Sequence, residues 1–73
     1  MSISIPGNRI REFRVRKNMT QKMLAKRIHC SPQSISGFER GVLPIRLDYC
    51  YAICLALDAT LNDIFWVPEL KNA

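Results

Sequence analysis

The sequence predicts an all-α domain made of five short helices. Apolar residues recur at helical spacing through most of the chain, and residues that cap or end helices separate the apolar segments. No part of the chain alternates strands with helices as a parallel sheet would require. With 73 residues, 48% hydrophobic and 23% charged, residues 1–73 are expected to fold as one small domain.

The first helix is expected from about Asn8 to Lys17, with Ile10 and Phe13 facing inward. Asn18 follows it and tolerates the left-handed backbone conformation in which many helices end. A second helix is expected after Thr20, whose hydroxyl is a natural N-cap. Its apolar stripe comprises Leu24, Ala25 and Ile28.

A tight turn at His29 and Cys30 is expected to lead into a third helix, Ser31–Arg40. Ser31 suits the N-cap, and Pro32 suits the first helical position, where no N–H is needed. Ile35 and Phe38 are expected to face the core, and Gly41 to end the helix. Two short helices joined in this way, over about residues 20–40, are typical of a helix-turn-helix, whose second helix enters the major groove of DNA.

The remaining segment is expected to contain a loop, Val42–Arg46, and two further helices. The fourth helix is expected to bury a stripe formed by Leu47, Cys50, Tyr51, Cys54 and Leu57. Thr60 and Asp63 resemble a capping box, which would open a short fifth helix. That helix is expected to carry Leu61, Ile64 and Phe65.

Short terminal strands are an additional expectation. The SISI segment, residues 2–5, alternates polar and apolar residues, which is a weak strand pattern. We expect it to pair, if it forms a ribbon, with the FWV segment, residues 65–67. The tail, residues 66–73, contains Pro68 and is not expected to be helical.

The net charge of +5 is unevenly distributed. From Met1 to Arg46, ten Lys and Arg face only Glu12 and Glu39, which gives +8, whereas Leu47–Ala73 has one Lys and four acids, which gives −3. This asymmetry suits a protein whose first two-thirds face a polyanion. An ordinary solvated basic surface is the alternative explanation.

Other classes of protein are disfavoured. The start, MSISIPG, lacks the features of a signal peptide, and the longest apolar run, Tyr49–Leu57, is too short to span a bilayer. Three cysteines without a CxxC pair suggest a reducing cytoplasm rather than a disulfide framework. No cofactor is expected.

Metal and catalytic sites are also disfavoured. His29 and Cys30 lack the further ligands that a metal site needs, and Cys50 and Cys54 lie on the apolar stripe as core thiols. A hydrolytic triad of Ser31, His29 and Asp48 is a weaker interpretation than helix capping, so we expect no metal site and no enzyme.

The segment from about Asn8 to Phe65 resembles the phage-repressor/Cro-type, or Xre-like, helix-turn-helix domains. The resemblance rests on four segments in sequence order: RIREFRVRKNMTQ, LAKRI, SPQSISGFERG and AICLALDATLNDIF. It implies a compact five-helix domain that binds double-stranded DNA as a homodimer, on a pseudo-palindromic operator. It also implies a cytoplasmic, nucleoid-associated protein of bacterial or phage origin, with no membrane role.

The resemblance also implies roles for individual residues. Gln33 matches a base-reading position, and its amide can bond the N6 and N7 atoms of adenine together. Ser34 is short enough to reach a base or a phosphate. The phosphate-contacting positions correspond to Thr20, Gln21, Arg40 and Arg46. Arg14 and Glu39 match a buried salt bridge that ties the first helix to the end of the third.

The chain departs from the family pattern at three positions. His29 stands where a glycine is usual in the turn, and it must adopt a positive φ. Pro32 replaces a polar residue that reads a base in some relatives. Gly37 stands where many relatives have a longer base-reading side chain, so either one contact is missing or the backbone approaches the DNA more closely.

The C-terminal residues offer two interpretations. The apolar residues Ile64, Phe65, Trp66, Val67 and Leu70 either form a two-fold interface or, in the tail, fold back onto the core. The favoured function is a repressor. The alternative is an antitoxin or other interaction module, which would bind an unidentified partner protein through this tail and DNA only for autoregulation.

Overall fold

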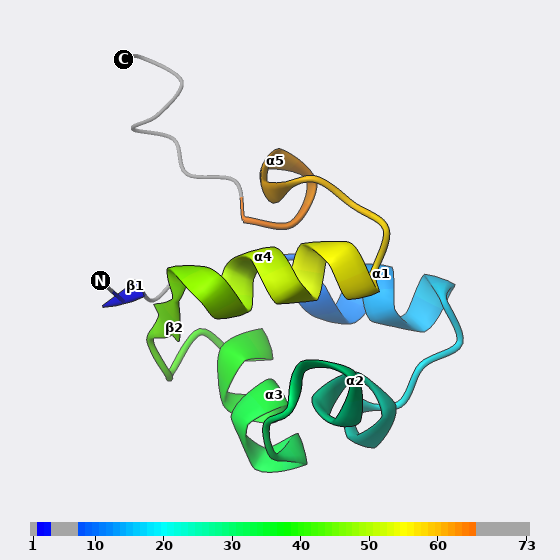
Figure 1. Cartoon of the computed structure of the whole chain (residues 1–73), viewed down its shortest axis with the longest axis horizontal. Helices are drawn as coiled ribbons and strands as arrows, with labels where there is room; N and C mark the ends of the chain where they lie inside the picture. The colour runs from blue at the N-terminus through cyan, green and yellow to red at the C-terminus, as the bar shows by residue number, and fades with distance from the viewer. Residues whose placement is uncertain (1, 4–7, 66–73) are drawn as a thin grey trace.

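The computed structural model describes residues 2–3 and 8–65 of the chain (Figure 1). Its helices are α1 (Ile10–Arg16), α2 (Gln21–Ile28), α3 (Pro32–Glu39), α4 (Leu47–Ala56) and α5 (Leu61–Ile64). Two short strands, β1 (Ser2–Ile3) and β2 (Ile45–Arg46), complete the described part. The predicted all-α class with five short helices is therefore confirmed.

Helix α4 crosses the middle of the molecule, with α5 on one side and the α2–α3 pair on the other (Figure 1). Helix α1 contacts α3 and lies behind α4 in this view. All five helices and β2 contribute to one core. Its fully buried large side chains are Ile10, Leu24, Ile35, Ile45, Ile53, Leu57, Ile64 and Cys50.

Local hydrogen bonds cap α2 and α5 at their predicted starts. The hydroxyls of Thr20 and Thr60 accept hydrogen bonds from the N–H groups of Met23, at 3.0 Å, and Asp63, at 3.2 Å. The Asp63 carboxylate in turn accepts the Thr60 N–H at 3.0 Å, which confirms the capping box. The bonds from the Thr60 N–H and then its hydroxyl hold the pKa of Asp63 below its usual value.

Left-handed residues end most of the helices. Asn18 and His29 have φ angles of 56° and 60°, Asp58 has 55°, and Gly41 has 71°. Asn18 and Gly41 therefore play the helix-ending roles expected of them. The positive φ of His29 confirms the prediction for this turn position, where a glycine is usual in the family.

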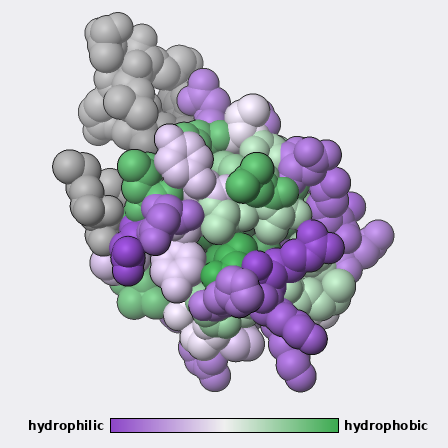
Figure 2. Space-filling view, viewed as in Figure 1, coloured by the Kyte–Doolittle hydropathy of each residue, from purple (hydrophilic) through white to green (hydrophobic). Residues whose placement is uncertain are grey.

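The buried face of α4 differs from the predicted one. Cys50 and Cys54 are buried as expected, but Leu47 and Tyr51 are exposed, and Ile53 is fully buried instead. Cys50, Ile53, Cys54 and Leu57 follow i, i+3, i+4, i+7 spacing, which is a regular helix face. The prediction was wrong because α4 is apolar on several sides, so more than one face fits the spacing. Hydrophobic surface is accordingly visible over α4 in Figure 2.

The expected terminal ribbon has a different partner. Ser2 and Ile3 pair antiparallel with Arg46 and Ile45, within the segment that we expected to be a loop. The FWV partner was therefore wrong, and its Trp66 and Val67 lie outside the described residues. Ile45 is fully buried in the core, where β2 packs against α4.

Candidate nucleic-acid interface

The turn between α2 and α3 is held by backbone and hydroxyl contacts. His29 takes the left-handed conformation, and the next N–H, that of Cys30, donates to the Ala25 carbonyl at 2.9 Å. Ser31 then caps α3, because its Oγ accepts the Ser34 N–H at 3.1 Å. Pro32 occupies the first turn of the helix as predicted. These contacts fix the direction in which α3 leaves α2.

The outer face of α3 presents polar residues. Pro32, Gln33 and Arg40 are exposed, whereas Ile35 and Phe38 are buried as predicted. The Gln33 amide makes no hydrogen bond to any described residue, so it is available to a ligand. Ser36, which the sequence reasoning missed, shares this face with Gln33 and Arg40 through i, i+3, i+7 spacing.

Ser34 is less available than expected. Its side chain is half-buried, and its hydroxyl lies 3.0 Å from the Ser31 hydroxyl. The Ser31–Ser34 contact therefore belongs to the cap of α3. The role of Ser34 in contacting DNA stays a prediction.

Gly37 does not lie open on the outer face of α3. It is buried under Leu43, and a Cβ added to Gly37 would meet the Leu43 Cγ at 2.6 Å. Leu43 therefore covers the position where many relatives have a longer base-reading side chain, and a contact of Gly37 itself with a base stays a prediction. Gly37 is glycine because a side chain from the following loop occupies the space beside it.

Gln21 and Thr20, both predicted to contact phosphate, make contacts within the chain. The Gln21 amide donates to Glu39 Oε1 at 3.0 Å, which connects the first residue of α2 to the end of α3. The Thr20 hydroxyl caps α2 through Met23. The backbone N–H groups of Gln21 and Lys22 still point from the first turn without an intrahelical partner, as they do in any helix.

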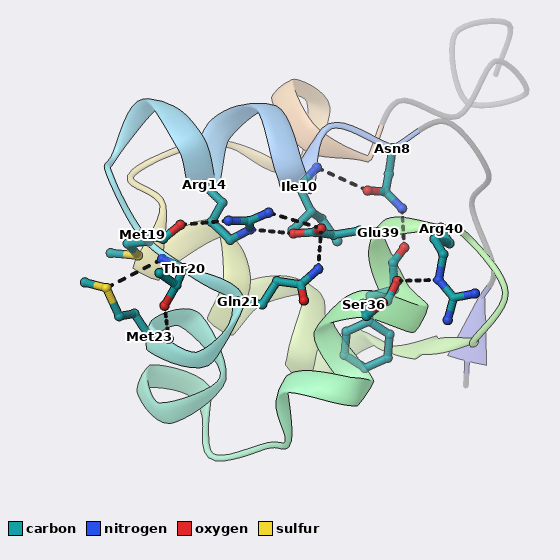
Figure 3. A network of polar contacts seen from close by, with 11 residues as sticks. Asn8, Ile10, Arg14, Met19, Thr20, Gln21, Met23, Ser36, Glu39 and Arg40 are labelled. Atoms are coloured by element: carbon teal, nitrogen blue, oxygen red, sulfur yellow. Dashed lines mark hydrogen bonds and ion pairs between the residues drawn. The ribbon is translucent and has the colours of Figure 1, made fainter.

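A buried ion pair joins α1 to α3, as the resemblance implied (Figure 3). The Arg14 Nε lies 2.6 Å from Glu39 Oε2, and its Nη2 donates to Oε1 at 3.3 Å. The two side chains are 10% and 6% exposed. Arg14 Nη1 also donates to the Met19 carbonyl at 2.8 Å, so the network holds the segment before α2 as well.

A second contact anchors the start of α1. The Asn8 side chain donates to the Phe38 carbonyl at 2.7 Å and accepts the Ile10 N–H at 3.1 Å (Figure 3). Together with Arg14–Glu39, it attaches α1 at two places along α3. Helix α3 is thus attached to α1 by polar contacts that lie outside its exposed face.

Comparison with known proteins gives the family. Residues 10–64 match the family described as Helix-turn-helix. The chain belongs to this family. An uncharacterized HTH-type transcriptional regulator of Archaeoglobus fulgidus is 40% identical over 61 residues, which is 84% of this chain and 86% of that protein. The resemblance to Xre/Cro-type domains is therefore confirmed.

Solved structures of helix-turn-helix proteins are also similar. The restriction-modification controller protein C.AhdI from Aeromonas hydrophila has a TM-score of 0.73 and 30% identity, covering 78% of this chain and 86% of its own. The clp gene regulator ClgR from Corynebacterium glutamicum has a TM-score of 0.70 and 33% identity, over 74% of this chain. The present chain spans only 57% of the length of that ClgR chain.

Positive charge remains unpaired on the helix-turn-helix. Carboxylates elsewhere pair with nearby cations: Glu12 with Arg9 and Arg16, Asp58 with Lys17, and Asp48 with Arg46. Within residues 8–65, no ion pair forms at Lys22, Lys26 or Arg27 of α2, or at Arg40 after α3. Arg46 is one of the residues predicted to contact phosphate. Its Nη2 lies 3.2 Å from Asp48 Oδ2, so its positive charge is partly neutralised.

The cysteines of this helix-turn-helix protein have the properties of structural thiols. Burial raises the pKa of all three thiols, Cys30, Cys50 and Cys54. A smaller contribution comes from the nearby Asp48 charge at Cys50, and from the Cys50 and Asp63 charges at Cys54. Their reactive thiolate forms are therefore disfavoured. In the described part of the chain, no group of three or more His, Cys, Asp or Glu could hold a metal ion.

The contacts of Ser31 and Asp48 do not support a hydrolytic triad of Ser31, His29 and Asp48. The Ser31 hydroxyl caps α3, and Asp48 accepts the Tyr49 N–H at 3.0 Å and pairs with Arg46.

Within residues 2–3 and 8–65, no helix has the length and apolar content that crossing a membrane needs.

Proposed function

We propose that this helix-turn-helix protein is a sequence-specific transcriptional repressor that binds a pseudo-palindromic operator as a homodimer. The observation that carries the proposal is that α2 and Arg40 carry positive charge without an ion pair among residues 8–65, on the same helix-turn-helix as the exposed Gln33 amide. A cationic surface attracts the phosphate backbone, and a free amide on a rigid helix can discriminate between bases. Occupying a promoter is the simplest route to repression.

The contacts divide into two kinds. The amino end of α2 and its lysines bind phosphates and set the register of the protein on the duplex. Gln33 and Ser36 on α3 face the base edges, and Gln33 is suited to adenine. The Glu39 carboxylate positions Gln21 for a phosphate contact through its remaining N–H. We infer no catalytic step, and we place the protein on cytoplasmic DNA of a bacterium or phage.

The role of Gln33 is tested by Gln33→Ala. A bidentate amide–adenine contact contributes about 1–3 kcal/mol of discrimination, so affinity for the preferred duplex should fall about 5- to 150-fold. The duplex is first selected by the wild-type protein from a random pool, and affinities are measured by fluorescence anisotropy across a salt series. Binding to a scrambled duplex should change little, because phosphate contacts carry it.

The matched control is Asn62→Ala, which removes an exposed amide on α5, away from α3. It should leave both affinities unchanged. If the wild-type protein binds selected and scrambled duplexes equally at every salt concentration, it is not a sequence-specific reader. If Gln33→Ala retains the wild-type preference, the reading residue lies elsewhere on α3.

Two of the residues that the sequence suggested for the homodimer interface are buried within the protomer. Ile64 and Phe65 are only 0% and 5% exposed, and they pack into the protomer's own core. Trp66, Val67 and Leu70 lie outside the described residues, and their part in an interface stays a proposal. An apolar stripe on α4, formed by Leu47, Tyr51 and Leu55 at i, i+4, i+8 spacing, supports a second contact between copies.

Charges at the ends of this α4 stripe suit a second copy of the chain. Arg46 precedes the stripe and Asp58 follows it, with side chains 68% and 87% exposed. In an antiparallel two-fold pairing, each Arg46 would face the Asp58 of the other copy. The same surface pairs with itself, as a symmetric dimer requires.

Leu55→Lys tests the α4 interface. Leu55 is 83% exposed, so the substitution should leave the fold intact while placing two like charges in the interface. We expect dimerisation measured by sedimentation to weaken at least about tenfold. Val15→Lys, on an exposed position of α1, is the control and should have no effect.

An unchanged dimer in Leu55→Lys would move the interface to the tail. A wild-type protein that stays monomeric, both free and on the selected duplex, would contradict the homodimer. Binding of a partner protein would then become the leading function.

A further inference from the structure

The loop after α3 is fastened to the outer side of that helix. The N–H groups of Val42 and Leu43 both donate to the Gly37 carbonyl, at 3.0 and 3.3 Å. A helix carbonyl near the end of a helix commonly accepts one such bond, and here it accepts two. The backbone of the loop is therefore fixed at Val42 and Leu43.

Leu43 occupies the space that a side chain of residue 37 would fill. An ideal Cβ on Gly37 would lie 2.6 Å from the Leu43 Cγ and 3.3 Å from its Cβ, too close for both to be present. Residue 37 lies one helical turn after Gln33, so side chains at the two positions stand on neighbouring parts of one helix face. The Leu43 side chain therefore covers the part of α3 that lies one helical turn after Gln33, although it comes from a loop.

The surroundings of Leu43 differ from those of a core residue. Its side chain is 40% exposed, whereas Ile45, two residues later, is fully buried. Leu43 cannot donate or accept a hydrogen bond, so it has no means of binding a phosphate or a polar base edge. What it can offer to a ligand at this face is an apolar contact.

Accepting the proposed function as its basis, we propose that Leu43 is a specificity-determining residue that contacts the C5 methyl group of a thymine beside the base read by Gln33. In the major groove, that methyl group is the one apolar feature of the base edges. Gly37 permits the contact because it lets the loop place Leu43 against the helix. The recognition surface is therefore made by α3 and its following loop together.

The experiment uses the duplex selected from a random pool and replaces each thymine by uracil, which lacks only the methyl group. The inference expects one thymine in each half-site whose replacement weakens wild-type binding about fourfold, the value of one buried carbon group. Leu43→Ala should bind the thymine and uracil duplexes equally. Leu43→Met, which keeps an apolar side chain, should retain part of the difference.

Val15→Ala is the matched control, since it truncates an exposed apolar residue on α1, outside the proposed interface and the recognition surface. It should keep the full thymine preference in a folded protein, with folding checked by circular dichroism. If Leu43→Ala is unstable, a wild-type scan without any uracil effect still overturns the inference, and Leu43→Met must then show the reduced thymine preference that supports it.

The outcomes separate the inference from the function on which it rests. A selected duplex that binds equally well with uracil at every position, or that contains no thymine near the Gln33 base, overturns the role of Leu43 and leaves the DNA-binding function intact. A thymine preference that persists in folded Leu43→Ala does the same. Failure to select any sequence overturns both.

Discussion

Glu39→Ala is expected to destabilise the protein by about 3–5 kcal/mol, because it leaves the Arg14 guanidinium buried without its carboxylate. The Arg14 and Glu39 side chains are 10% and 6% exposed and are joined by two hydrogen bonds, so water cannot replace the lost partner easily. A domain of this size has a total stability of only about 5–10 kcal/mol. Urea denaturation followed by circular dichroism would measure the loss.

The control is Arg16→Ala, which removes another ion-pair arginine of α1. Arg16 lies 3.2 Å from Glu12, but the two side chains are 64% and 44% exposed, so this pair should contribute about 0–1 kcal/mol. The double variant Arg14→Met, Glu39→Met should recover much of the stability, because no lone charge is left buried. Equal losses for Glu39→Ala and Arg16→Ala would contradict the assignment of a buried pair.

Ile53→Ala is expected to cost about 2–5 kcal/mol of unfolding free energy. Ile53 is fully buried at the centre of α4, so truncation leaves a cavity in the single core. Leu55→Ala, on the same helix but 83% exposed in the protomer, should change the stability of the monomer, measured at dilute protein, by less than about 0.5 kcal/mol. Denaturation curves of the two variants should differ in midpoint and keep the wild-type slope.

A reversed order, with Leu55→Ala or Tyr51→Ala costing more than Ile53→Ala, would restore the face predicted from the sequence. The comparison therefore tests which side of α4 is buried. It also tests the dimer indirectly, because Leu55 must be exposed in the protomer to take part in an interface.

Helix starts and ends were predicted correctly where they depend on residues only a few positions apart. Thr20, Ser31 and Thr60 cap helices because a hydroxyl there meets an N–H three residues later. The Pro32 position and the left-handed Asn18 also follow from backbone preferences alone. These features predicted most of the helices and the helix-turn-helix itself.

The errors came from contacts between distant segments. The face of α4 could not be chosen from spacing, because the exposed Leu47 and Tyr51 present large apolar surfaces at helical spacing as the buried residues do. The pairing of Ser2 and Ile3 with β2 joins segments that carry no mutual signal. Gly37 was interpreted through its helix alone, and only the fold brings Leu43 against it.

The candidate site was predicted in type and in part of its residues. The family resemblance gave the Arg14–Glu39 pair, and the structure adds Gln21 as its third member. Ser36 could have been found from its i+3 spacing to Gln33, since both face outward on one helix. Which carboxylates neutralise which cations, and therefore which cations stay free, required the three-dimensional arrangement.

The close packing of Leu43 against Gly37 has a consequence for the divergence and redesign of operator preference. The exposed residues of α3 can be exchanged singly, because the core and the buried ion pair lie on its opposite side. Positions 37 and 43 cannot, since any side chain larger than hydrogen at 37 competes for the volume that Leu43 fills. A lineage or a designer that adds a reading residue at 37 must shorten residue 43 at the same time, so these two positions should change as a unit.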